Sequence, residues 1–163
     1  MNRLVGSLAL LGFLLSLSAH VAALAGVDVA ARIPWVWGLH VGIFAVFLPF
    51  VMSTRKLVDG RLSLATLRPL FPSWVLVLGA AVFAYTAVNF ALFMFGGHGG
   101  SPEIRDGRFV LQDHGRLIRE LSEAEYTALQ ANQVRGFSGH WLLFYFMPFA
   151  WFMLRRTDLP RRE

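Results

Sequence analysis

No Asp, Glu, Lys or Arg interrupts residues Pro69–Pro102, which read PLFPSWVLVLGAAVFAYTAVNFALFMFGGHGGSP. A helix needs about 20 apolar residues to cross a bilayer, at a rise of about 1.5 Å per residue, so this run is long enough. Three further charge-free runs occupy Leu4–Val27, Ile33–Thr54 and Gly136–Leu154. Because lipid supplies no water to the backbone polar groups, each run predicts a transmembrane helix.

The composition is typical of an integral membrane protein. Of the 163 residues, 56% are hydrophobic and 15% are charged, whereas soluble domains are about 25% charged. We therefore expect an all-α membrane protein, a single membrane domain over residues 1–163, with four transmembrane helices at about residues 4–26, 33–53, 73–96 and 138–154. The absence of cysteine excludes disulfides, thiolate metal sites and covalent c-type haem attachment.

The first apolar run has two interpretations. With Arg3 as a basic start, Leu4–Leu17 as an apolar region and Ala23-Leu24-Ala25 as a cleavage site, it resembles a secretory signal peptide. The charge-free run continues to Val27, which is longer than a usual signal-peptide core and favours a retained helix.

The positive charges lie at the ends of the apolar runs and not on one face, so no nucleic-acid partner is expected. With four spans, three groups of basic residues fall on one side of the membrane: Arg3; Arg55, Lys56, Arg61 and Arg68; Arg155, Arg156, Arg161 and Arg162. The positive-inside rule makes that side the cytoplasm. Both termini are then cytoplasmic in a bacterial inner membrane, and the loop at residues 97–136 is periplasmic.

This long loop has the pattern of a small hairpin-plus-helix module between the third and fourth spans. Asp106-Gly107 suits a tight turn, and Arg108–Gln112 and Arg116–Leu121 suit two strands. Ser122-Glu123-Ala124-Glu125 is a capping box that predicts the start of a helix. We expect this helix to run to about residue 134 and to stop at Gly136.

Four polar side chains in the spans fall at a similar depth from the outer face, when residues are counted at about 1.5 Å each: His20, His40, Asn89 and Tyr145. Such groups usually face the bundle interior. They suit a haem held by His20 and His40, a quinone bonded to His and Tyr, or a metal ion bound by His20, His40 and His140. The alternative is a network of hydrogen bonds between helices.

One short motif has a catalytic resemblance. Gly136-Phe137-Ser138-Gly139 resembles the Gly-x-Ser-Gly of rhomboid intramembrane proteases, which pair the serine with a histidine from another span. His20 or His40 would then serve as the base. Four spans are too few for that family, and a serine near the start of the fourth span also suits a helix N-cap, so we assign no catalytic residue.

A second resemblance covers about a quarter of the chain. Its pieces are Gly99-Gly100-Ser101-Pro102-Glu103, Asp113-His114-Gly115, Arg119-Glu120-Leu121 and Arg135-Gly136-Phe137-Ser138-Gly139-His140-Trp141. They resemble a signature of small bacterial multi-pass inner-membrane proteins of uncharacterised function. The resemblance implies a localisation in the inner membrane and no mechanism.

Three functions remain open. The favoured one is a non-enzymatic accessory, assembly or interaction component that contacts the lipid bilayer and, through the outer loop, a membrane-protein partner. The second is a redox protein that binds haem, a metal or quinone at the histidine layer. The third is an oligomeric transporter or channel, although no Asp, Glu, Lys or Arg lies within the apolar runs to form an ion pathway.

The charge pattern predicts the orientation in the membrane. A reporter that is active only in the periplasm should be silent when it is fused after Arg61 and active after Gln112. The opposite result would place the basic link outside the cell.

Overall fold

The computed structural model describes residues 2–55, 64–96 and 99–156. Its long helices are α1 (Asn2–Leu24), α3 (Gly38–Thr54), α5 (Ser73–Gly96) and α6 (Glu123–Phe149). The short elements are α2 (Val29–Arg32), η1 (Pro34–Trp37), α4 (Leu64–Leu67), β1 (Ser101–Arg105), β2 (Arg108–Asp113), β3 (Arg116–Glu120) and the π-helical turn η2 (Ala150–Leu154). Among the described residues, four segments are long and apolar enough to cross a membrane, which confirms the predicted fold class.

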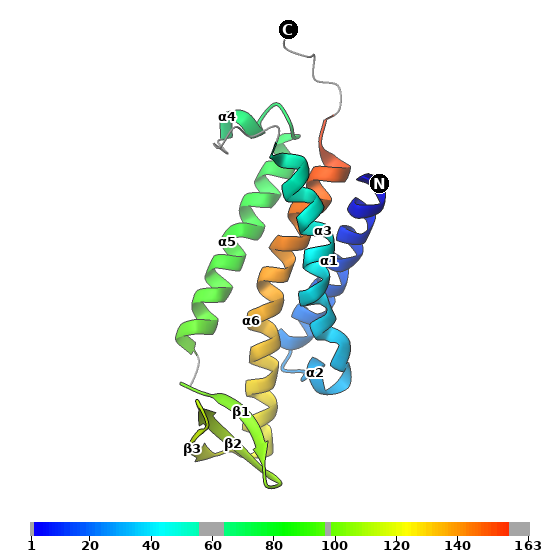
Figure 1. Cartoon of the computed structure of the whole chain (residues 1–163). Helices are drawn as coiled ribbons and strands as arrows, with labels where there is room; N and C mark the ends of the chain where they lie inside the picture. Colours follow the sequence, from blue (N-terminus) through cyan, green and yellow to red (C-terminus); the bar gives the residue numbers. More distant parts are fainter. Residues whose placement is uncertain (1, 56–63, 97–98, 157–163) are drawn as a thin grey trace.

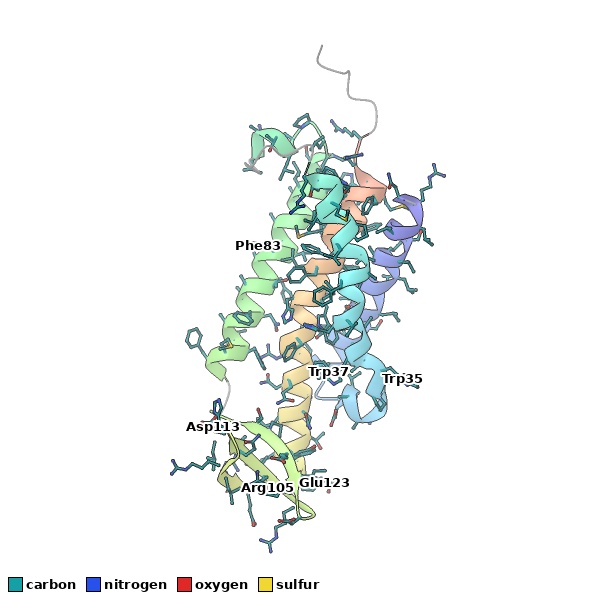
Figure 2. The ribbon with its side chains drawn as sticks, viewed as in Figure 1. Trp35, Trp37, Phe83, Arg105, Asp113 and Glu123 are labelled. Atoms are coloured by element: carbon teal, nitrogen blue, oxygen red, sulfur yellow. The ribbon has the colours of Figure 1, made fainter. Side chains whose placement is uncertain are left out.

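Helix α6 lies in the middle of the bundle, with α1 and α3 on one side and α5 on the other (Figure 1). The sheet lies at one end, called here the sheet end, and α4 and the start of α1 lie at the other, the α4 end. Arg105, Asp113 and Glu123 are all at the sheet end (Figure 2). Trp35 points away from the bundle there, as expected of an aromatic residue at a membrane interface.

Small residues bring α1 close to α6. The buried face of α1 includes Gly6, Ala9, Gly12, Ser16 and Ala19. Lipid tails are as apolar as the helices, so helices in a membrane associate through close packing, which small residues permit. A Cβ atom on Gly12 would lie 2.2 Å from the Tyr145 ring, so this contact requires glycine.

The predicted module between α5 and α6 is present, with one strand more than expected. Strands β1, β2 and β3 form an antiparallel sheet in that order. The connection between β1 and β2 is Asp106-Gly107, with φ of 50° and 75°, and His114-Gly115 between β2 and β3 has φ of 48° and 86°. These positive values suit two-residue hairpin turns. Ser122 and Glu125 form the predicted capping box.

The predicted end of the module helix is wrong. Helix α6 does not stop at Gly136 but continues without a break from Glu123 to Phe149. Gly136 acts as a packing residue, because a Cβ atom there would lie 2.4 Å from the Phe93 ring of α5. Ser138 and His140 are therefore in the middle of a helix and not at the start of one. Sequence predictions at Lys56, Arg61, Arg161 and Arg162 concern residues outside the described ranges.

The capping box gives a prediction for the module. Replacing Ser122 by Ala should destabilise the first turn of α6 by about 1 kcal/mol, because the amide of Glu125 loses its acceptor. Faster amide hydrogen exchange over residues 123–126 would measure the loss. Ser122→Thr keeps the hydroxyl cap and is the control, and equal exchange in both variants would contradict the prediction.

Candidate functional site

All four polar side chains predicted to form one layer make hydrogen bonds that involve α6. His20 comes from α1, His40 from α3 and Asn89 from α5, while Tyr145 belongs to α6 itself. They meet α6 at successive turns between Arg135 and Tyr145. Among the described residues, no hydrogen bond joins two of the four to each other. The four side chains therefore make their contacts along one helix, and a shared ligand position stays a prediction.

His20 is almost completely buried and uses both ring nitrogens. Its Nδ1 lies 2.8 Å from the Ser138 hydroxyl, and its Nε2 makes a short hydrogen bond with the Tyr85 hydroxyl. The Ser138 hydroxyl donates to the carbonyl of Val134 at 2.6 Å, so His20 Nδ1 must donate to Ser138 and Nε2 must accept from Tyr85. A neutral imidazole with its proton on Nδ1 satisfies all of these groups and joins α1, α5 and α6.

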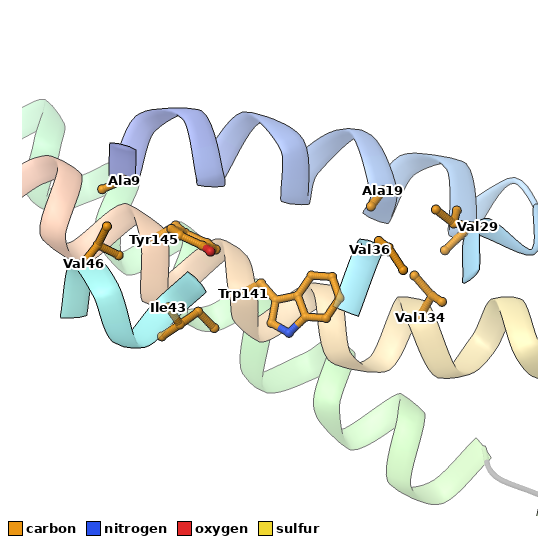
Figure 3. Close-up of a cluster of buried hydrophobic side chains, with 10 residues drawn as sticks. Ala9, Ala19, Val29, Val36, Ile43, Val46, Val134, Trp141 and Tyr145 are labelled. Carbon is orange, nitrogen blue, oxygen red and sulfur yellow. The ribbon is translucent and has the colours of Figure 1, made fainter. Parts of the chain in front are cut away.

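His40 and Tyr145 join α3 to α6 at the next level. The indole Nε1 of the buried Trp141 donates to His40 Nδ1 at 3.0 Å, so His40 carries its proton on Nε2. The Tyr145 hydroxyl donates to the carbonyl of Leu39 at 2.7 Å. Trp141 and Tyr145 lie in the apolar cluster between α1, α3 and α6 (Figure 3). Each polar tip therefore has a partner at the edge of a hydrophobic core.

Asn89 contacts α6 at Arg135, the last charged residue before the charge-free part of this helix. Its side-chain amide donates to the carbonyl of Arg135 at 3.2 Å, and its Oδ1 accepts from the Arg135 guanidinium at 2.7 Å. Arg135 also donates to the side chain of Asn132 at 2.8 Å. The guanidinium of this half-buried arginine therefore donates to side-chain amide oxygens. Among the described residues, it forms no ion pair with a carboxylate.

The positions of His20, His40 and His140 can be compared with what haem or metal binding would require. Haem ligation through His20 Nε2 would replace its hydrogen bond with Tyr85 and leave the one between Nδ1 and Ser138. The rings of His40 and His140 lie edge to face with centroids 6.2 Å apart. Within the described ranges, no group of three His, Cys, Asp or Glu residues is placed to hold a metal ion. Metal binding by His20, His40 and His140, and haem or quinone binding, stay predictions that an absorbance spectrum and a metal analysis would test.

The Ser138–His20 pair meets one requirement of a serine nucleophile, a base within hydrogen-bonding distance. It lacks two others. Ser138 has no exposed surface, and it lies in the interior of α6, where backbone N–H groups are used by the helix and none remains to stabilise an oxyanion. The pair is therefore better explained as a link between two helices than as a catalytic dyad.

Tyr85, Thr86 and Trp141 are hydrogen-bonding partners that the sequence did not indicate. Tyr85 is the second partner of His20, and the Thr86 hydroxyl donates to the carbonyl of Gly139 at 3.0 Å. A single hydroxyl group in an apolar run gives no periodic pattern. Its depth in the membrane is still informative, because a polar group in lipid needs a hydrogen-bonding partner at the same depth.

The contact between His20 and Tyr85 predicts a measurable coupling. His20→Leu and Tyr85→Phe should each destabilise the bundle, and a double-mutant cycle should give a coupling of about 0.6 kcal/mol, the average for hydrogen bonds between membrane helices. The free energy of unfolding in mixed micelles is the measurement.

The control cycle pairs His20→Leu with Tyr145→Phe, which removes the bond to Leu39 and shares no partner with His20. These two changes should add to within about 0.5 kcal/mol. Additivity of His20→Leu with Tyr85→Phe would show that their contact contributes nothing, and a loss of several kcal/mol from His20→Leu alone would instead favour a bound cofactor.

Comparison with protein-family models, curated proteins and solved structures gave no match for this chain.

Proposed function

We propose that this chain is a non-enzymatic accessory or assembly component of the bacterial inner membrane, with the sheet end on the extracytoplasmic side and β3 as the strand that contacts a partner membrane protein. Arginines at the α4 end and the resemblance to small inner-membrane proteins support the compartment and orientation. The observation that carries the proposal is the exposure of β3.

Every residue of β3 is exposed. Strands β1 and β2 pack against α6, and β3 lies at the outer edge of the sheet. Leu117 and Ile118 keep 50% and 47% of their surface exposed. An edge strand presents unpaired N–H and C=O groups, to which an extended segment of another protein can add as a further strand.

The support beneath the sheet suits this role. Val110 and Leu111 of β2 are buried. The rings of Phe109 and Tyr126 lie 4.8 Å apart, which fixes β2 to the first turns of α6. Because α6 continues into the bundle, no flexible linker separates the sheet from the membrane helices at this side. A partner bound at β3 would therefore be held at a defined position relative to the bilayer.

In-cell photocrosslinking tests the proposal. A photoreactive residue at Leu117 should give a discrete adduct with a partner protein, whereas the same residue at Glu123, which is exposed on α6, should not. Adding Ile118→Lys should remove the Leu117 adduct without unfolding the module. Adducts with lipid alone, adducts with a second copy of this chain, or equal adducts from both positions would contradict the proposal.

A further inference from the structure

A groove runs between α3 and α5 toward the α4 end, and α6 forms its floor. It encloses about 730 Å³, a volume in the range of small-molecule sites. Large rings form its walls, with Phe47 and Phe50 from α3, Phe83 from α5 and Trp151 from η2. Ala80 and Phe83 on the α5 wall are exposed, so the groove is open at the surface of the helix bundle.

The end of the groove near α4 is positively charged. Arg55, an exposed residue, lines the groove beside Thr54. The guanidinium of Arg155 lies 4.4 Å from the centre of the Trp151 ring, and Trp151 is itself part of the wall. All ion pairs among the described residues are formed by side chains of the sheet end. Within the described part of the chain, Arg55 and Arg155 therefore form no ion pair with a carboxylate.

Apolar contact alone cannot decide the occupant, because hydrocarbon in the bilayer is as apolar as the groove. Interfaces between membrane helices favour small residues that let backbones approach, whereas most residues that line this groove are large aromatic or aliphatic ones. Guanidinium groups bind phosphate oxygens strongly. We propose that the groove binds one anionic diacyl phospholipid, with its acyl chains against Phe47 and Phe83 and its phosphate between Arg55 and Arg155.

Native mass spectrometry of the purified full-length chain tests this assignment. Phosphatidylglycerol and phosphatidylcholine with identical acyl chains are the probes. The wild type should retain phosphatidylglycerol preferentially, and Arg55→Gln should lower that preference about fivefold, the effect expected for one arginine near a membrane surface. Arg3→Gln removes the same charge at the same end of the bundle, away from the groove, and should leave the preference unchanged.

A second pair of variants tests the apolar part of the site. Ala80 lines the groove and is exposed, so Ala80→Phe should fill the groove and reduce retention of both lipids. Ala81→Phe is the control, since Ala81 is exposed on the same helix and does not line the groove. Equal retention of the two lipids by the wild type, equal effects of Arg55→Gln and Arg3→Gln, or dimers in place of lipid adducts would each overturn the proposal.

Discussion

The bundle depends on the burial of α6 against three apolar helices at once. In lipid no hydrophobic force pushes helices together, so close contact and satisfied polar groups must hold them. Helix α6 provides both. Its Tyr145 ring fills the space over Gly12 of α1, and its Gly139 lies so near Asn89 of α5 that a Cβ atom there would be 2.0 Å from the Asn89 side chain. Between these contacts, Ser138 and Trp141 supply hydrogen bonds to α1 and α3.

The continuity of α6 also determines how the sheet is attached to the membrane helices. A helix that ended at Gly136 would leave the sheet on a separate domain joined by a turn. In the structure the same helix that begins with the Ser122 capping box continues through the bundle to Phe149, so sheet and membrane helices share one support. Asn89 of α5 reinforces this junction by its hydrogen bonds with Arg135 of α6, at the level where the charged part of α6 gives way to the apolar part.

The sequence predicted the parts of the fold that depend on local chemistry. The charge-free runs predicted the four helices because backbone groups in lipid must form their hydrogen bonds within the helix. Asp106-Gly107 predicted a turn, and the capping box predicted the start of a helix. The predicted helix end at Gly136 was wrong because a glycine can either end a helix or permit close packing, as Gly136 does against Phe93, and the sequence alone does not distinguish these roles. The partners of His20 could not be predicted, since depth can be counted along a sequence whereas the rotation of each helix is set by packing.

The two ends of the molecule differ in how their charges are satisfied. At the sheet end, several arginines are paired within the module, as in Arg108 with Glu120 at 2.9 Å and Arg119 with Glu125 at 2.8 Å. Such exposed pairs add little stability, but within each pair the charges cancel. At the α4 end, Arg55 and Arg155 have no such partner among the described residues and border an apolar groove. Chemistry at the sheet end therefore favours contact with protein, and chemistry at the α4 end favours contact with lipid headgroups.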